Sequence, residues 1–420
     1  MLTLAARVAT AAGQIAIALF LLKAYGPAAV GLFAVFISNT MLASLISRQG
    51  FDRTLTLFAV RPRASRHALP LLRSYARTIV FWLPVTGLLN VLVYLATIPQ
   101  PPSPVMAILL VLLPTVVALS SLASGYFTGA GRTTAATVQQ PGFPVALTAL
   151  VLASCYALGV ELDVYGTYFA VAFLLAASGI LRILRGRAAV PAGTAGARAG
   201  MPTRIAHLAR GYSRRYLIIN FFTTFSSVYF ISFLALFVAH DQIGQFRVVE
   251  RLALVIAFNL TFINIILPTG AIGRWLEKDQ TRFERAMRQT FLFQYATGLG
   301  IFLFYLAFMD RIMAWIEVDN PYLYVLPLAA QLVNALTGPV RVLLMYLGGQ
   351  RVLQVCAVAE TLGSAVLYWA LYRAFGLTGL AVAYFLAIAV PNLVLARIVH
   401  ARFGIVPLPF VAMAQLRRRV

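Results

Sequence analysis

Residues His240–Thr269 read HDQIGQFRVVERLALVIAFNLTFINIILPT, a largely apolar run that carries Arg247, Glu250 and Arg251 near its start. A helix of this length can cross the roughly 30 Å hydrocarbon core of a bilayer. Side chains three and four residues apart share one face of a helix, so the three charges lie together. An arginine or glutamate in hydrocarbon costs at least about 2.5–3.5 kcal/mol, so these side chains are expected to face protein or water. They are the first candidates for a substrate-binding site.

The composition places the whole chain in a membrane. Hydrophobic residues make up 61% of it, charged residues 11%, and the mean hydropathy is +0.86. A soluble domain has roughly 25% charged residues. The net charge of +22 rests on 34 Lys+Arg against 12 Asp+Glu. In a soluble protein this excess suggests nucleic acid, whereas in a membrane protein it reflects positive-inside loops and anionic lipid. We therefore expect membrane lipids as partners and no nucleic acid.

Apolar stretches near the length of a spanning helix recur along the chain. We expect an all-α membrane protein with about twelve of them, at 6–24, 29–47, 76–97, 104–127, 138–159, 164–184, 216–239, 246–269, 291–309, 322–346, 352–373 and 378–399.

The charges of the connections alternate. The connections at 48–77, 185–215 and 274–288 and the tail are basic, while those between them are short and neutral or acidic. Basic connections stay in the cytoplasm, so both termini are predicted to be cytoplasmic.

The longest connection is rich in Gly, Ala and Pro, which is typical of a flexible linker. We expect four parts: a six-helix lobe at 1–184, a basic linker at 185–215, a second six-helix lobe at 216–400 and a basic tail at 401–420. Residues 203–214 are either a basic surface helix or a solvated loop. Leu276, Phe283 and Met287 indicate an amphipathic helix before the ninth span.

The two halves repeat each other at a nearly constant offset along the chain. Val30-Gly31-Leu32-Phe33 matches Ile243-Gly244-Gln245-Phe246, and Tyr165-Gly166 matches Thr378-Gly379 at the same offset. Gly129-Ala130-Gly131-Arg132 matches Gly348-Gly349-Gln350-Arg351 at a slightly larger one. With six spans in each half, both halves run in the same direction and the repeat is parallel.

The chain resembles the MOP superfamily of flippases and exporters, and within it the Wzx-type flippases of lipid-linked oligosaccharides. The resemblance covers nearly the whole chain. It rests on Tyr25-Gly26-Pro27-Ala28-Ala29-Val30-Gly31-Leu32-Phe33, Gly50-Phe51-Asp52-Arg53, Ile243-Gly244-Gln245-Phe246, Pro268, Gly348-Gly349-Gln350 and Gly376-Leu377-Thr378-Gly379-Leu380-Ala381-Val382-Ala383.

The resemblance implies two six-helix lobes in a V that alternate between inward- and outward-open states in the bacterial inner membrane. Its substrate would be an undecaprenyl-diphosphate-linked oligosaccharide, moved from the cytoplasmic to the periplasmic leaflet. Other polysaccharide-assembly proteins are possible partners. Transport would need no cofactor, and coupling to H⁺, Na⁺ or the membrane potential stays open.

Nine residues are candidates for substrate binding: Arg247, Glu250, Arg251, Arg48, Arg53, Arg341, Glu360, Asn39 and Asn259. Arginine binds diphosphate as a bidentate fork, and Glu250 is either the internal partner of an arginine or a proton or cation site. Each has a structural alternative. The arginines of the 240–269 run could extend to the membrane surface or form salt bridges between the lobes. Arg48 and Arg53 could set the membrane topology, and Arg341 could pair with Glu360. The two asparagines could form hydrogen bonds between helices.

Other functions are weighed against the flippase. A cation-coupled multidrug exporter of the same superfamily would want a carboxylate in the first or seventh span, and neither 6–24 nor 216–239 contains one. Peptidoglycan-precursor flippases usually carry two further helices. A membrane polymerase or glycosyltransferase would normally show a large outer loop or an acidic metal-nucleotide motif. No Asp-x-Asp, HExxH or GxxxxGK[ST] motif occurs, so we expect neither an enzyme nor a metal site.

Overall fold

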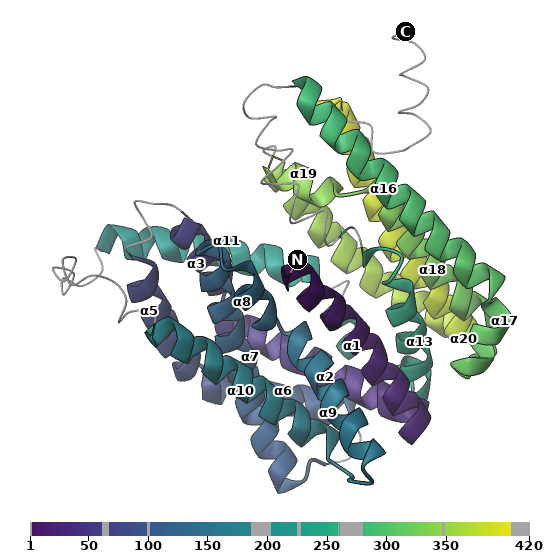
Figure 1. The fold of residues 1–420 in the computed structure, drawn as a ribbon, viewed down its shortest axis with the longest axis horizontal. Coiled ribbons are helices and arrows are strands. Elements are labelled where there is room, and N and C mark those ends of the chain that lie inside the picture. Colours follow the sequence, from purple (N-terminus) through teal and green to yellow (C-terminus); the bar gives the residue numbers. More distant parts are fainter. Residues whose placement is uncertain are drawn as a thin grey trace. The chain divides into compact units, whose positions relative to one another are not determined.

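The computed structural model describes residues 2–60, 67–98, 101–185, 203–224, 228–258, 260, 280–346 and 349–404. Within these ranges the regular elements are helices and no strand occurs, which confirms the predicted all-α class. The chain divides into two compact units, Met1–Leu236 and Phe237–Val420 (Figure 1).

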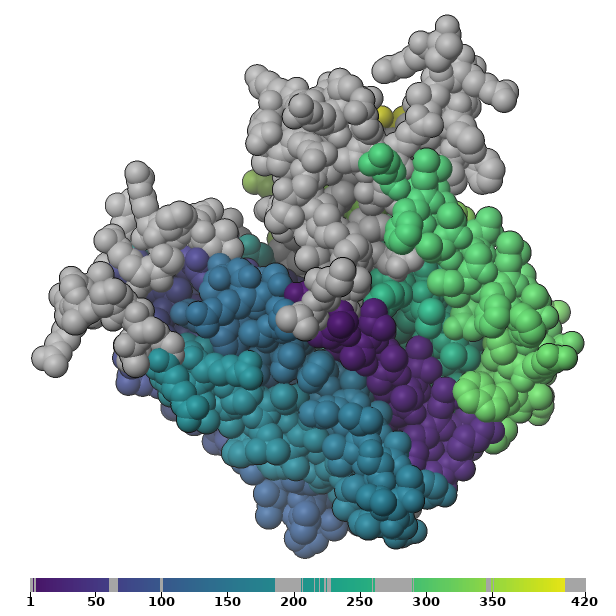
Figure 2. All heavy atoms as spheres, in the orientation of Figure 1, coloured from purple at the N-terminus to yellow at the C-terminus, as the bar shows by residue number. Residues whose placement is uncertain are grey.

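The N-terminal unit is built around one long central helix, α7, which packs against α2, α3, α6 and α10. Helix α1 packs against α9, and their side chains lie directly against each other in the space-filling view (Figure 2). The helices of the unit are α1 (Leu2–Tyr25), α2 (Pro27–Arg48), α3 (Phe51–Val60), α5 (Ala68–Phe81), α6 (Leu83–Thr97), α7 (Pro104–Gly129), α8 (Thr133–Val138), α9 (Gly142–Ala157), α10 (Val164–Arg185), α11 (Thr203–Thr224) and α12 (Phe230–Leu234).

In the C-terminal unit, α18 packs against α13, α16 and α20. Its helices are α13 (His240–Ala253), α16 (Gln280–Ala307), α17 (Met309–Trp315), α18 (Pro321–Thr337), α19 (Val340–Tyr346) and α20 (Gln350–Phe403). Helix α20 contains the predicted spans 352–373 and 378–399, which meet at Gly376. The backbone there has φ 57° and ψ −136°, a conformation open in practice only to glycine.

The helix boundaries support the internal repeat. Helix α2 begins at Pro27 and α13 at His240, so Gly31 and Gly244 occupy equivalent positions in the second turn of their helices. Pro114 inside α7 and Pro327 inside α18 are separated by the same offset as these two glycines. These two pairs of residues therefore lie on matched helices.

The starts of α7 and α18 use the same local solution. Each has a side-chain cap followed by proline: Ser103 accepts a hydrogen bond from the Met106 amide at 3.2 Å, and Asn320 accepts one from the Tyr322 amide at 3.0 Å. A capping oxygen satisfies one of the free amides at a helix start, and proline at the first position has no amide to satisfy.

Five described helices are long and apolar enough to cross a membrane, or up to seven if the bent pairs α5–α6 and α16–α17 each count as one span. The predicted number of twelve is therefore not established. Large apolar side chains cover the outside of these helices, with Phe81 79% and Val355 69% exposed. Such surfaces are stable against lipid rather than water.

Several predicted boundaries differ from the observed ones. Helix α13 starts at His240, before the predicted 246, and residues 261–279 lie outside the described part. Of the two alternatives for residues 203–214, a helix and a loop, the structure shows the helix. It is the first part of α11, which continues to Thr224 and belongs to the N-terminal unit. From Gln280 the predicted amphipathic helix is the first part of α16, while Leu276 lies outside the described residues.

Candidate functional site

A polar cavity of about 420 Å³ lies inside the N-terminal unit. It takes residues from α1, α2, α3, α7 and the start of α9. Its lining is Thr10, Gln14, Arg48, Asp52, Arg53, Thr56, Ser121, Ser124, Gly125, Thr128, Gln140, Pro141 and Gly142. Two predicted candidates, Arg48 and Arg53, are therefore brought together at one cavity.

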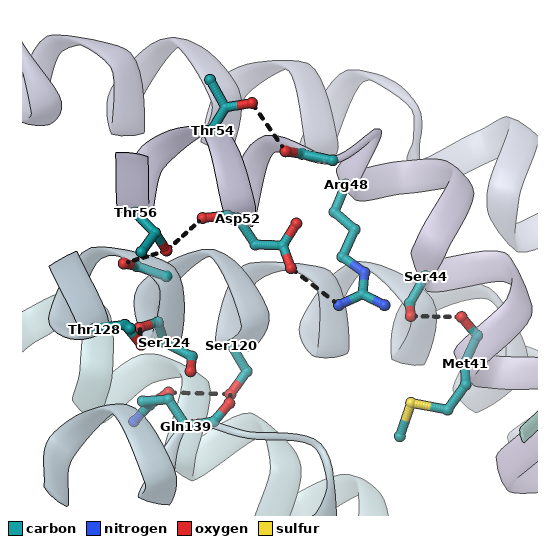
Figure 3. Close-up of polar contacts among 12 residues, drawn as sticks. Met41, Ser44, Arg48, Asp52, Thr54, Thr56, Ser120, Ser124, Thr128 and Gln139 are labelled. Carbon is teal, nitrogen blue, oxygen red and sulfur yellow. Dashed lines mark hydrogen bonds and ion pairs between the residues drawn. The ribbon is translucent and has the colours of Figure 1, made fainter. Parts of the chain in front are cut away.

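The charged residues of the cavity lie on both sides of a sharp corner between α2 and α3. Gln49 and Gly50 form this corner with φ of 47° and 75°. The turn brings Arg48 and Asp52 together, and the Arg48 guanidinium donates to the Asp52 carboxylate at 3.4 Å (Figure 3). This distance is long for a charge-assisted hydrogen bond, and both side chains keep 13–14% of their surface exposed.

Helix α7 approaches the same corner very closely. A Cβ on Gly125 would lie 2.3 Å from the Asp52 carbonyl oxygen, so only glycine fits this contact. The Thr56 hydroxyl donates to the Gly125 carbonyl at 2.9 Å and joins α3 to α7. These contacts fix the backbone of Asp52 against α7, while the carboxylate of Asp52 points toward Arg48 (Figure 3).

Helix α11 is held against the other side of the corner. A Cβ on Gly50 would lie 2.5 Å from the Ser213 carbonyl oxygen, and the hydroxyls of Thr54 and Ser213 are hydrogen-bonded at 3.0 Å. This basic helix thus packs on Gly50 and Thr54, which are neighbours in the chain of the residues that carry the cavity's charges. Whether it also lies on a membrane surface stays a prediction.

The C-terminal unit holds a second charged pair, which is much drier. Arg247 donates to Glu250 one turn along α13, with side-chain exposures of 8% and 3%. Around it lie the rings of Phe246 and Tyr384, 5.3 Å apart, and the amide of Gln331 donates to the Tyr384 hydroxyl at 2.8 Å. Glu250 was expected to be either the partner of an arginine or a proton or cation site, and the structure shows it paired with Arg247.

The other described candidates are not among the residues that line the cavity. Arg341 donates to Glu360 at 2.7 Å, the pairing that was their structural alternative. The Asn39 amide donates to the Thr97 hydroxyl at 3.0 Å and joins α2 to α6. Arg251 is half-buried on α13, and Asn259 lies outside the described residues. Their roles in binding stay predictions.

Sequence reasoning did not single out most of the cavity lining. Asp52 follows Arg48 by four residues, a spacing that predicts an ion pair within one helix. The two residues lie on different helices, however, so the rule does not apply to them directly. Ser121, Ser124 and Thr128 are on one side of α7 at helical spacing, yet small polar residues in a membrane helix usually serve packing. Among the described residues no group of three metal-ligating side chains occurs.

Comparison with solved structures identifies the fold. An inward-facing multidrug resistance MATE family transporter of the MOP superfamily is 14% identical, with a TM-score of 0.61 over 93% of this chain and 92% of that one. The MATE multidrug transporter DinF-BH is 15% identical, with a TM-score of 0.62 over 96% and 95%. A variant of the Vibrio cholerae MATE transporter VcmN is 12% identical, with a TM-score of 0.54 over 96% and 95%.

These likenesses extend over almost the full chain, and they confirm the predicted MOP-type fold. No protein-family model matches the sequence, and no curated protein does. The Wzx-type branch therefore stays a prediction from the sequence motifs.

Proposed function

We propose that this chain is an alternating-access transporter of the MOP type. The observation that carries the proposal is the likeness to MATE transporters over 93–96% of the chain, in a sequence that is 61% hydrophobic. Two compact units with repeated helix boundaries are the architecture that many transporters use to expose one site to alternate sides. An enzymatic function has no such support.

The comparisons favour export of small molecules over the flippase as the specific activity. The similar proteins are described as multidrug transporters, and this was the alternative to a lipid-linked substrate. An exporter of small molecules is therefore the first candidate. One feature of the chain counts against organic cations: the helix region 6–24 has no carboxylate that could bind them.

The flippase for lipid-linked oligosaccharides is the second candidate, and the cavity of the N-terminal unit favours it. Pockets for drug-like molecules are mostly apolar and aromatic. The lining here consists largely of hydroxyl, amide and charged side chains and contains no aromatic ring. Such a surface suits a hydrophilic headgroup. The inner-membrane location, cytoplasmic termini and glycan-assembly partners belong to this proposal too.

One pair of assays tests both candidates. The purified chain is reconstituted in vesicles with a fluorescent organic cation, and the gene is expressed in cells that lack their own oligosaccharide flippase. We expect the chain to pass one assay or to export one member of a panel of small metabolites, whereas protein-free vesicles and empty-vector cells do neither. Dye efflux would identify the exporter and restored surface glycan the flippase. If the folded protein moves neither substrate, and no panel of metabolites is exported, the transporter proposal is wrong.

A further inference from the structure

The charges of the N-terminal cavity select for the charge of its ligand. Its lining carries two cations, Arg48 and Arg53, and one anion, Asp52, which leaves one excess positive charge. A cationic ligand is disfavoured by this excess. The charge of a divalent anion would exceed this single positive charge, and the anion would be repelled by the carboxylate of Asp52. The balance favours a ligand with a single negative charge.

Three buried polar atoms of the lining residues have no hydrogen-bond partner among the described residues, and they indicate the rest of the ligand. The Arg48 Nε, the Asp52 Oδ1 and the Ser121 Oγ make no hydrogen bond within the described part of the chain. Buried polar atoms without partners cost free energy, and a bound group relieves that cost. Arg48 needs an acceptor, Asp52 needs a donor, and Ser121 takes either. A ligand that combines a carboxylate with hydroxyl groups answers all three needs.

The cavity also provides a route from the surface to its floor. Arg53 and Thr128 are exposed, whereas Ser121, Ser124 and Gly125 are buried. The exposed arginine attracts an anion from solvent, and the buried hydroxyls then replace the water around the ligand.

We propose that this cavity binds a small hydroxylated monoanion, a sugar acid being the simplest example. The carboxylate faces Arg48 and Arg53, and ring hydroxyls donate to Asp52 and exchange hydrogen bonds with Ser121. The inference rests on the proposed transport function, for which it names the substrate class. Such a group exists as a free metabolite and as a residue of a larger glycan.

The test is equilibrium binding of radiolabelled glucuronate to the purified full-length chain, with unlabelled competitors. Glucose has the hydroxyls without the charge, acetate has the charge without the hydroxyls, and sulfate has two charges and no donor. Unlabelled glucuronate should compete at least about tenfold better than any of the three, because each lacks a hydrogen bond or charge that the site offers. No glucuronate binding, or equal competition by sulfate or glucose, would overturn the proposal.

Substitution of Asp52 tests the selection directly. Asp52→Asn removes the repulsion toward a divalent anion and should raise sulfate competition by about tenfold relative to glucuronate. The matched control is Asp163→Asn, since Asp163 lies outside the cavity and accepts a hydrogen bond from the Gly166 amide. Unchanged selectivity in Asp52→Asn, at wild-type folding, contradicts the role of the carboxylate.

Two further outcomes identify the source of the ligand. If reconstituted vesicles transport free glucuronate, the free acid is the substrate. If glucuronate binds but is not transported, the sugar acid belongs to a larger glycan. Both outcomes keep the proposal. Transport of another substrate without any glucuronate binding would leave the proposed function intact and reject this inference alone.

Discussion

Two of the arginine–carboxylate pairs, Arg48–Asp52 of the N-terminal unit and Arg247–Glu250 of the C-terminal unit, show how the surroundings change the role of the same chemical groups. In the N-terminal unit Arg48 and Asp52 are 3.4 Å apart at a polar cavity, and 13–14% of each side chain is exposed. In the C-terminal unit the side chains of Arg247 and Glu250 are only 8% and 3% exposed. The first pair can exchange its partner for a ligand. In the second pair, both side chains lie on α13, and each satisfies the charge of the other away from solvent.

The largest test of this contrast removes the buried carboxylate. Glu250→Leu leaves the Arg247 guanidinium buried without its counter-charge, which costs about 3–5 kcal/mol when one partner of a buried pair is lost. We expect the free energy of unfolding in detergent to fall by that amount.

A double variant separates the charge from the packing. Arg247→Met combined with Glu250→Leu removes both charges and keeps apolar volume, so most of the stability should return. If Glu250→Leu is as stable as the wild type, the Arg247–Glu250 pair is solvated in the native protein. It would then not differ from the Arg48–Asp52 pair in its surroundings.

The corner between α2 and α3 gives the next largest effect. Gly50→Ala places a Cβ at φ 75° and 2.5 Å from the Ser213 backbone oxygen, so conformational strain and a clash add together. The strain alone costs roughly 1–2 kcal/mol, and we expect Gly50→Ala to lower the free energy of unfolding by about 2 kcal/mol or more.

Gly131 provides the matched control for that substitution. It has a similar φ of 73°, but a Cβ there meets nothing within 4 Å. Gly131→Ala should therefore show the strain without the clash and be the milder change. Equal losses in the two variants would mean that α11 is not held against the corner.

The difference between the two units also explains what the sequence could predict. Hydrophobic length, charge alternation and the constant offset between the halves are local or periodic signals, and the helical class and the repeat follow from them. The partner of a charge depends on packing instead. Glu250 lies three residues from Arg247, so that pair was foreseeable, whereas the cavity joins Thr10, Asp52 and Ser121 from three distant helices.

The smallest expected effect is the most informative about the N-terminal pair. Asp52→Asn should change the free energy of unfolding by less than about 1 kcal/mol, since a long, partly exposed ion pair contributes little. Added salt should reduce that difference further, because partly exposed charges are screened. Unfolding titrations at low and high salt, beside Glu250→Leu as the insensitive reference, measure both effects. A loss as large as that of Glu250→Leu would show that Asp52 holds the fold together, and the carboxylate could not then turn from Arg48 toward a ligand. A small, salt-sensitive loss leaves it free to do so.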